Sequence, residues 1–330
     1  LPIYASSASY FFAAASLARS IEIKGIKKDS IQGDLKFLDI ISKMGAKIKL
    51  EEGYVKASVL TRLKGAIINL PIASVGATEN ILMAATLAKG QTIINNAARE
   101  PEIIDLAECL IKMGAKIQGA GTSQIIIDGV KKLNGTSHSI VPDRIEAGTY
   151  AIAAAITGSK LILNNINLKL FTGFLKPLEN SGVILEQIND NQIQVSRKGR
   201  NITATNIKTN PYPEFPTDMQ AQFMSLMTIA RGESQIVENI FENRFMHVLE
   251  LVRMGAKINI NGNTATITGV KKLSGAKVMA TDLRASVSLV LAGLVAKGKT
   301  TVDRIYHLER GYERLAEKLI ACGADIQIIY

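Results

Sequence analysis

Residues 215–258 read FPTDMQAQFMSLMTIARGESQIVENIFENRFMHVLELVRMGAKI. A loop ending at Asp218 precedes a small-residue apolar run that stops at Gly232, and a β-type run follows at residues 235–237. A second amphipathic run ends at Gly255 and carries apolar residues at helical spacing: Met246, Leu249 and Val252. The spacing of the apolar residues and the positions of the glycines predict helix, strand, helix and strand in this stretch.

The same unit recurs five times along the chain. A helix-ending glycine returns every 68 to 73 residues, at Gly45, Gly114, Gly182, Gly255 and Gly323. An earlier stop precedes each of them by 23 to 25 residues. Glycine suits a helix end because the position after the last helical residue needs a positive φ. Two markers that keep their register predict a repeated βαβ-type layer and therefore an α/β chain.

Composition limits the class of protein. A length of 330 residues predicts two domains, and an apolar content of 47% is enough for packed cores. We expect no membrane span, since no apolar run is long enough. We also expect no signal peptide, since the sequence from Leu1 onward has no basic n-region. Reduced thiols at Cys109 and Cys322 indicate a cytoplasmic protein. Three histidines without zinc spacing predict no metal, and we expect no cofactor.

A formal charge of +10 allows three interpretations: nucleic-acid binding, a cleft for small anionic substrates, or lysines that cover the surface. The basic residues are spread along the repeats, and no dense basic run with interleaved aromatic residues is present. We therefore favour the anionic substrate over nucleic acid.

Charged residues collect at two corners of the repeat. Asp143, Asp218 and Asp282 lie 14 to 16 residues before the stop in three successive repeats, where each would cap a helix. Arginines stand at the second corner or near the first: Arg99, Arg244, Arg284 and Arg310. If the repeats pack around pseudo-threefold axes, these corners converge. Buried arginines then predict an anionic ligand, because an unpaired buried charge is costly.

The second repeat offers two further candidates. Ser74, Val75 and Gly76 precede a helix whose free N–H groups suit a phosphate, although helix capping alone explains the serine. Glu100 and Glu102 flank Pro101, where helix initiation is an equally local explanation.

From about Leu50 to Tyr330 the chain resembles the bacterial UDP-N-acetylglucosamine enolpyruvyl transferase family. The resemblance runs through SVGATENI, INNAAREPEI, VPDRIEAGTY, FPTDMQAQF, FENRFMH and VDRIYHLERGYERL. It implies an inside-out α/β barrel of βαβαββ units in two domains, with five of the usual six units present. We expect two units in residues 1–138 and three in residues 139–330.

The resemblance also implies residue roles. Asp218 matches the proposed base for the sugar 3-hydroxyl, with Asp282 and Arg310 at the reacting centre. Ser74, Val75 and Gly76 match the cradle of the uridine diphosphate, and Ile240 matches a backbone contact to the amino sugar. Arg244 and Arg284 match guanidinium groups around phosphoenolpyruvate. Three corner residues complete the candidate binding set: Glu100, Glu102 and Asp143. The implied substrates are UDP-N-acetylglucosamine and phosphoenolpyruvate, with no nucleic-acid or membrane partner.

Residues 1–46 depart from that family. ASSASYF and QGD resemble the start of enolpyruvylshikimate-phosphate synthase, a member of the same superfamily. The transferase family's usual first unit is missing, with its Lys-Asn pair and its loop bearing a reactive Cys, so we expect weakened turnover. Two alternatives stay open here: shikimate-pathway synthase activity, and an inert chain that at most binds ligand.

Overall fold

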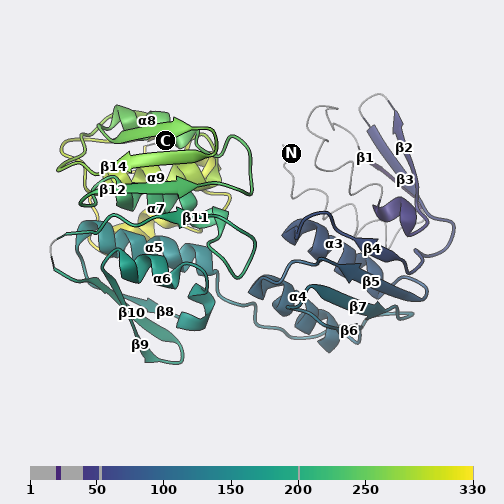
Figure 1. The fold of residues 1–330 in the computed structure, drawn as a ribbon. Helices are drawn as coiled ribbons and strands as arrows, with labels where there is room; N and C mark the ends of the chain where they lie inside the picture. The colour runs from purple at the N-terminus through teal and green to yellow at the C-terminus, as the bar shows by residue number, and fades with distance from the viewer. Residues whose placement is uncertain (1–19, 24–39, 52–53, 200, 330) are drawn as a thin grey trace. The chain divides into compact units, whose positions relative to one another are not determined.

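The sequence repeat is a layer of helices and strands (Figure 1). The computed structural model describes residues 20–23, 40–51, 54–199 and 201–329. The chain divides into two compact lobes, an N-terminal lobe, Leu1–Val141, and a C-terminal lobe, Pro142–Tyr330. The ASSASYF and QGD stretches of the first repeat lie outside the described residues.

The N-terminal lobe contains the first two repeats. Its described elements are β1 (Ser20–Ile23), β2 (Lys47–Glu51), β3 (Tyr54–Ser58), β4 (Ile67–Asn69), α3 (Val75–Thr86), β5 (Gln91–Asn95), α4 (Pro101–Lys112), β6 (Lys116–Gln118) and β7 (Gln124–Asp128). The first three strands form a sheet in the order β1-β3-β2. In the second repeat, β4 and β5 pair in parallel, so α3 crosses between them, and a closing hairpin gives the order β4-β5-β7-β6.

The C-terminal lobe contains the other three repeats. Its third repeat has α5 (Arg144–Thr157), β8 (Leu161–Asn164), η3 (Leu168–Phe171), α6 (Leu175–Asn180), β9 (Val183–Asn189) and β10 (Gln192–Arg197). The fourth has β11 (Ile207–Lys208), η4 (Thr217–Met219), α7 (Gln220–Met227), β12 (Glu233–Val237), α8 (His247–Arg253), β13 (Lys257–Asn261) and β14 (Thr264–Thr268). The fifth has β15 (Lys277–Met279), α9 (Leu283–Gly293), β16 (Thr301–Asp303), η5 (Ile305–His307) and α10 (Leu315–Ala321). The order β11-β12-β14-β13, with β11 parallel to β12, repeats that of the N-terminal lobe.

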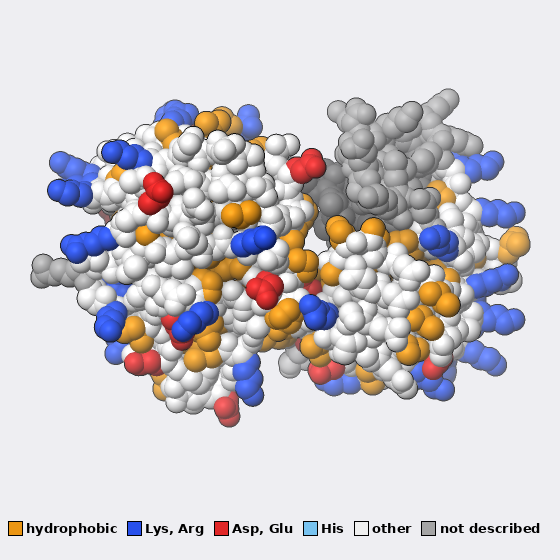
Figure 2. All heavy atoms as spheres, in the orientation of Figure 1, with side chains coloured by type: hydrophobic (Ala, Val, Ile, Leu, Met, Phe, Trp, Pro, Cys, Tyr) orange, Lys and Arg blue, Asp and Glu red, His pale blue; other side chains and the backbone are white. Residues whose placement is uncertain are grey.

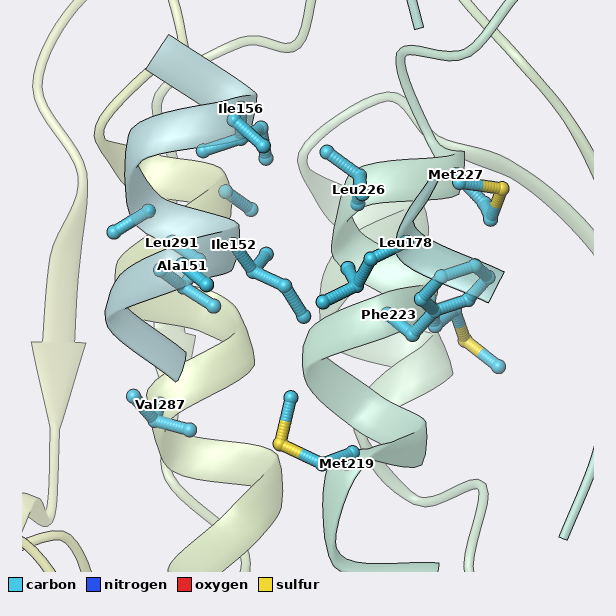
Figure 3. Close-up of a cluster of buried hydrophobic side chains, with 14 of the residues drawn as sticks. Ala151, Ile152, Ile156, Leu178, Met219, Phe223, Leu226, Met227, Val287 and Leu291 are labelled. Atoms are coloured by element: carbon cyan, nitrogen blue, oxygen red, sulfur yellow. The ribbon is translucent and has the colours of Figure 1, made fainter. Parts of the chain in front are cut away.

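The first helices of the three C-terminal repeats form the interior of their lobe. Helices α5, α7 and α9 pack against one another, and Figure 3 shows their apolar side chains meeting between them. Every residue of α7 is buried. Burying a large apolar side chain contributes roughly 1.5–3 kcal/mol, so this bundle is a main source of stability. Helices lie inside and amphipathic layers outside, which confirms the inside-out α/β fold expected from the resemblance.

The predicted helix ends are confirmed. All five helix-ending glycines have φ between +90° and +102°: Gly45, Gly114, Gly182, Gly255 and Gly323. A side chain would strain the backbone there, which explains why the marker holds its register through the repeats.

The apolar residues noted at helical spacing in the sequence do not form the buried face of α8. Met246 and Leu249 are 50% and 71% exposed, and Val252 is also exposed. The buried face is shifted by one position and carries His247, Val248 and Leu251. Helical spacing fits either set, and the short helix turns the second set toward the core.

Two surface observations bear on partners. No helix within the described ranges is long and apolar enough to cross a membrane. On the face drawn in Figure 2, the Lys and Arg side chains are spread over both lobes, with a row along one edge of the N-terminal lobe.

Candidate active site

Asp218 is the centre of a charged cluster in the C-terminal lobe. Its carboxylate accepts a hydrogen bond from Arg244 Nη2 at 2.9 Å, and Arg284 Nη2 lies 3.5 Å from its other oxygen. Asp218 belongs to η4, Arg244 to the loop between β12 and α8, and Arg284 to the first turn of α9. Two repeats therefore contribute charges to one point.

The expected cap at Asp218 is wrong, whereas the other two caps are confirmed. Asp143 accepts hydrogen bonds from the first turn of α5, and Asp282 accepts them from Arg284 N and Ala285 N in α9. Helix α7 starts only at Gln220, and its N-cap, Met219, makes no side-chain cap. The 3₁₀ turn η4 intervenes and leaves the Asp218 carboxylate for other partners.

The electrostatics of the cluster favour an ionised carboxylate. Burial would raise the pKa of Asp218, but the charges and hydrogen bonds of Arg284 and Arg244 outweigh it and hold the pKa below its usual value. The Asp218 side chain is still 40% exposed, whereas those of Arg244 and Arg284 are mostly covered. Two guanidinium groups beside one carboxylate suit an anion, and the charge of Asp143 also acts on Arg284.

A buried polar junction lies beside Arg284. The Tyr312 hydroxyl is 3.0 Å from Thr149 Oγ1 and accepts a hydrogen bond from Gln222 Nε2 at 3.1 Å. Burial, the main cause, raises the pKa of Tyr312 and keeps its hydroxyl protonated. The Arg284 guanidinium lies 5.6 Å from the centre of the Tyr312 ring, within range of a cation–π interaction. Helices α5, α7 and α9 are thus joined at the tyrosine.

A close approach brings Tyr312 to this place. A Cβ on Gly311 would lie 2.3 Å from Leu283 Cδ1, at the start of α9. Glycine therefore lets the segment before α10 pack against the helix that carries Arg284. Arg310 is exposed one residue before this contact.

The buried junction could not be found from local sequence. Tyr312 lies within the LERGYERL motif, but Thr149 and Gln222 are 163 and 90 residues away from it. Their side chains follow no spacing rule. Ile240, the expected backbone contact, is half-buried, and its N–H donates to the buried carboxylate of Glu238 at 2.9 Å. Glu238 also carried no signal in the sequence analysis.

In the N-terminal lobe, the start of α3 is open. Ser74 caps the helix by accepting from Ala77 N at 3.4 Å, and Val75 is the first helical residue. Gly76 is exposed, and a Cβ there would meet no atom within 4 Å. The helix start can therefore present free N–H groups to an anion.

Carboxylates from two helices gather near this lobe's second corner. Burial, followed by repulsion from Glu102 and Glu100, raises the pKa of Glu79 on α3. Glu100 is the N-cap residue of α4 without a side-chain cap, and Pro101 begins the helix as expected. Glu79 is the member that the sequence analysis did not single out. Within the ranges that the structure describes, no three His, Cys, Asp or Glu residues are grouped to hold a metal ion.

Comparison with known sequences identifies the relatives. The chain matches the EPSP synthase (3-phosphoshikimate 1-carboxyvinyltransferase) family over residues 4–54 and 39–319. It is 59% identical over 289 residues to a UDP-N-acetylglucosamine 1-carboxyvinyltransferase from Granulibacter bethesdensis, covering 88% of this chain and 68% of the relative. The enzymes of the same name from Paramagnetospirillum magneticum and Caulobacter vibrioides are 58% and 56% identical, each over 88% of this chain and 67% and 68% of their own lengths.

Solved structures share the fold. The enolpyruvyl transferase NikO from Streptomyces tendae matches with a TM-score of 0.86 at 23% identity, over 96% of this chain and 76% of its own. An EPSP synthase from Acinetobacter baumannii matches with a TM-score of 0.73 at 22% identity, over 99% of this chain and 79% of its own. At such identities the likeness concerns architecture alone. The sequence relatives are far closer, and on their evidence the chain is a transferase that belongs to the UDP-N-acetylglucosamine 1-carboxyvinyltransferase family.

Proposed function

We propose that the protein transfers the enolpyruvyl group of phosphoenolpyruvate to the 3-hydroxyl of UDP-N-acetylglucosamine and releases inorganic phosphate. The names of the relatives at 56–59% identity support the choice of substrates. The observation that carries the residue assignment is the Asp218 carboxylate held between Arg244 and Arg284. We place the reaction in peptidoglycan precursor synthesis, in the cytoplasm.

The chemistry follows from this cluster. The sugar 3-hydroxyl oxygen bonds to C2 of phosphoenolpyruvate while the vinyl CH₂ gains a proton, which gives a tetrahedral intermediate. Loss of a methyl proton and departure of phosphate then form the enol ether. Asp218 takes the hydroxyl proton as general base. Arg244, Arg284 and Arg310 offset the phosphate and carboxylate charges as they shift in the transition state.

The lowered pKa of Asp218 fits this role once ligand is present. Without an anion, Arg284 and Arg244 hold the carboxylate ionised and lower its pKa. An anionic substrate that pairs with these arginines offsets their charge. The proton affinity of Asp218 then rises at the moment when a base is needed.

The remaining candidates take supporting roles in this proposal. The start of α3, with Ser74, Val75 and Gly76, binds the diphosphate through its N–H groups. The Ile240 backbone contacts the amino sugar. Acidic residues order the two corners: Glu100, Glu102, Asp143 and Asp282.

Melting curves followed by a phosphate-release assay test the proposal. A ligand that binds only the folded state raises the melting temperature, so UDP-N-acetylglucosamine should raise it, and phosphate release should require both substrates. The absence of both a melting-temperature shift and phosphate release would refute the proposal. Release that depends on shikimate 3-phosphate, and not on the sugar nucleotide, would instead support the related synthase reaction.

A further inference from the structure

Glu238 is a buried carboxylate that accepts four hydrogen bonds from three segments. It is 3% exposed and follows the last residue of β12. Oε1 accepts from Thr209 Oγ1, Ile240 N and Phe241 N at 2.8, 2.9 and 3.1 Å. Oε2 accepts from Thr217 Oγ1 at 2.9 Å. Such a satisfied polar cluster fixes the positions of its donors, since each would be costly to leave unpaired.

The fourth repeat differs from the second, third and fifth at this position. The residues that follow β5, β8 and β16 are Asn96, Asn165 and Arg304, with φ of 56°, 57° and 60°. Glu238 follows β12 and lies outside this left-handed region. The repeat that contains Asp218 therefore turns by means of a buried acid where its neighbours use a left-handed residue.

Two links join the turn to the candidate site. Glu238 binds the Thr217 hydroxyl, and the next residue, Asp218, pairs with Arg244 at the far end of the loop. Phe241 connects the two links, because its N–H donates to Glu238 and its ring centre lies 4.9 Å from the Arg244 guanidinium. The loop of residues 238–244 is thus tied to η4 at both ends.

We propose that Glu238 is a positioning residue for the transfer reaction. It fixes η4 and the 238–244 loop relative to each other, so that the Asp218 carboxylate and the Ile240 backbone meet the same amino sugar. The ligand named here rests on the proposed function, whereas the tie between loop and η4 does not. Its bonds end on loop N–H groups and on the neighbour of Asp218, which is how a supporting group orders a site.

Three variants test the proposal. Glu238→Ala removes all four acceptor contacts. Glu238→Gln can accept the three Oε1 bonds through its amide oxygen and donate from its amide nitrogen to the Thr217 hydroxyl. Glu233→Gln changes an exposed acid at the start of β12, the strand that Glu238 follows, and is the matched control.

We expect Glu238→Ala, assayed well below its melting temperature, to raise the KM and the calorimetric Kd for UDP-N-acetylglucosamine by about tenfold or more. The KM and Kd of Glu238→Gln should stay within about threefold of the parent values, and those of the control should match the parent values. In the ligand-free protein, amide hydrogen exchange at Ile240 and Phe241 should accelerate in Glu238→Ala and not in the other two.

Folded Glu238→Ala with unchanged KM, Kd and exchange would overturn the proposal, as would Glu238→Gln being as impaired as Glu238→Ala. If Glu238→Ala does not fold, Glu238→Asp replaces it, because it keeps the charge but withdraws the carboxylate by one methylene. An unchanged KM in that variant would also overturn the proposal. Failure of the parent protein to bind the sugar nucleotide would refute the proposed function, while the exchange measurement would still decide the role of Glu238.

Discussion

Asp143, Asp218 and Asp282 occupy one place in three successive repeats but have different partners. Asp143 and Asp282 each accept two backbone hydrogen bonds at the start of a helix. Asp218 pairs with two arginines. The different partners coincide with a difference in the length of the helix that follows: α7 has 8 residues, against 14 in α5 and 11 in α9.

A 3₁₀ turn changes the use of the carboxylate. In η4, Met219 N donates to Pro216 O and Gln220 N donates to Thr217 O. Backbone carbonyls therefore accept the hydrogen bonds that a capping side chain would otherwise accept. The Asp218 carboxylate is then available to Arg244 and Arg284. Within one repeated architecture, a later helix start converts a structural acid into a candidate catalytic one.

Replacing Asp218 with Asn should have the largest effect. An amide of the same shape cannot take the hydroxyl proton, so steady-state phosphate release should fall about 10²–10⁴-fold. Asp190→Asn, an exposed change in the turn between β9 and β10, is the control and should match the parent rate. A rate within tenfold of the parent for Asp218→Asn would remove the distinction between this aspartate and the two caps.

The sequence predicted what a local rule governs. A positive φ admits little besides glycine, so the five helix ends could be read directly. The η4 turn could not be predicted, because residues 217–219 fit the start of a helix as well as a 3₁₀ turn. Leu249 is exposed on α8, because helical spacing alone does not tell which of two neighbouring faces packs against the core. Thr149, Gln222 and Tyr312 meet across three repeats, and no spacing within one repeat indicates that contact.

The second prediction concerns His247, whose pKa is affected by charged residues from both kinds of corner. Burial lowers its pKa to about 4, with the charge of Asp282 opposing and that of Arg244 adding to the effect. The unfolded chain therefore binds the proton first, and stability should fall by about 3 kcal/mol as the pH drops from about 6.5 to 4. Denaturant midpoints at pH 7 and 4.5 measure this.

His247→Leu should flatten that slope, whereas His307→Gln, at a partly exposed site, should retain it. The titration of Asp218 does not contribute to the stability change measured between pH 7 and 4.5. Its pKa is lowered, so its contribution persists down to about pH 4 and is lost below that value. An unchanged slope in His247→Leu would show that another group titrates.

The third prediction addresses the junction that joins the capped helices α5 and α9 to α7. Tyr312→Phe removes the hydroxyl bound to Thr149 and Gln222 and keeps the ring beside Arg284. Losing these two buried hydrogen bonds should destabilise the protein by about 1–3 kcal/mol. Denaturation by urea measures the loss. A fall in turnover much larger than the stability loss implies would show that the hydroxyl also orders the site around Arg284.

The smallest effect isolates the caps themselves. Asn can cap a helix and Ala cannot, so at Asp143 and Asp282 the Ala variant should be about 1 kcal/mol less stable than the Asn variant. At Asp218 this difference should be smaller, because the side chain makes no cap there. Urea denaturation of the six variants gives the three differences without reference to activity. Equal differences at all three positions would mean that Asp218 also supports its helix, and that the later start of α7 does not explain why this carboxylate faces the arginines.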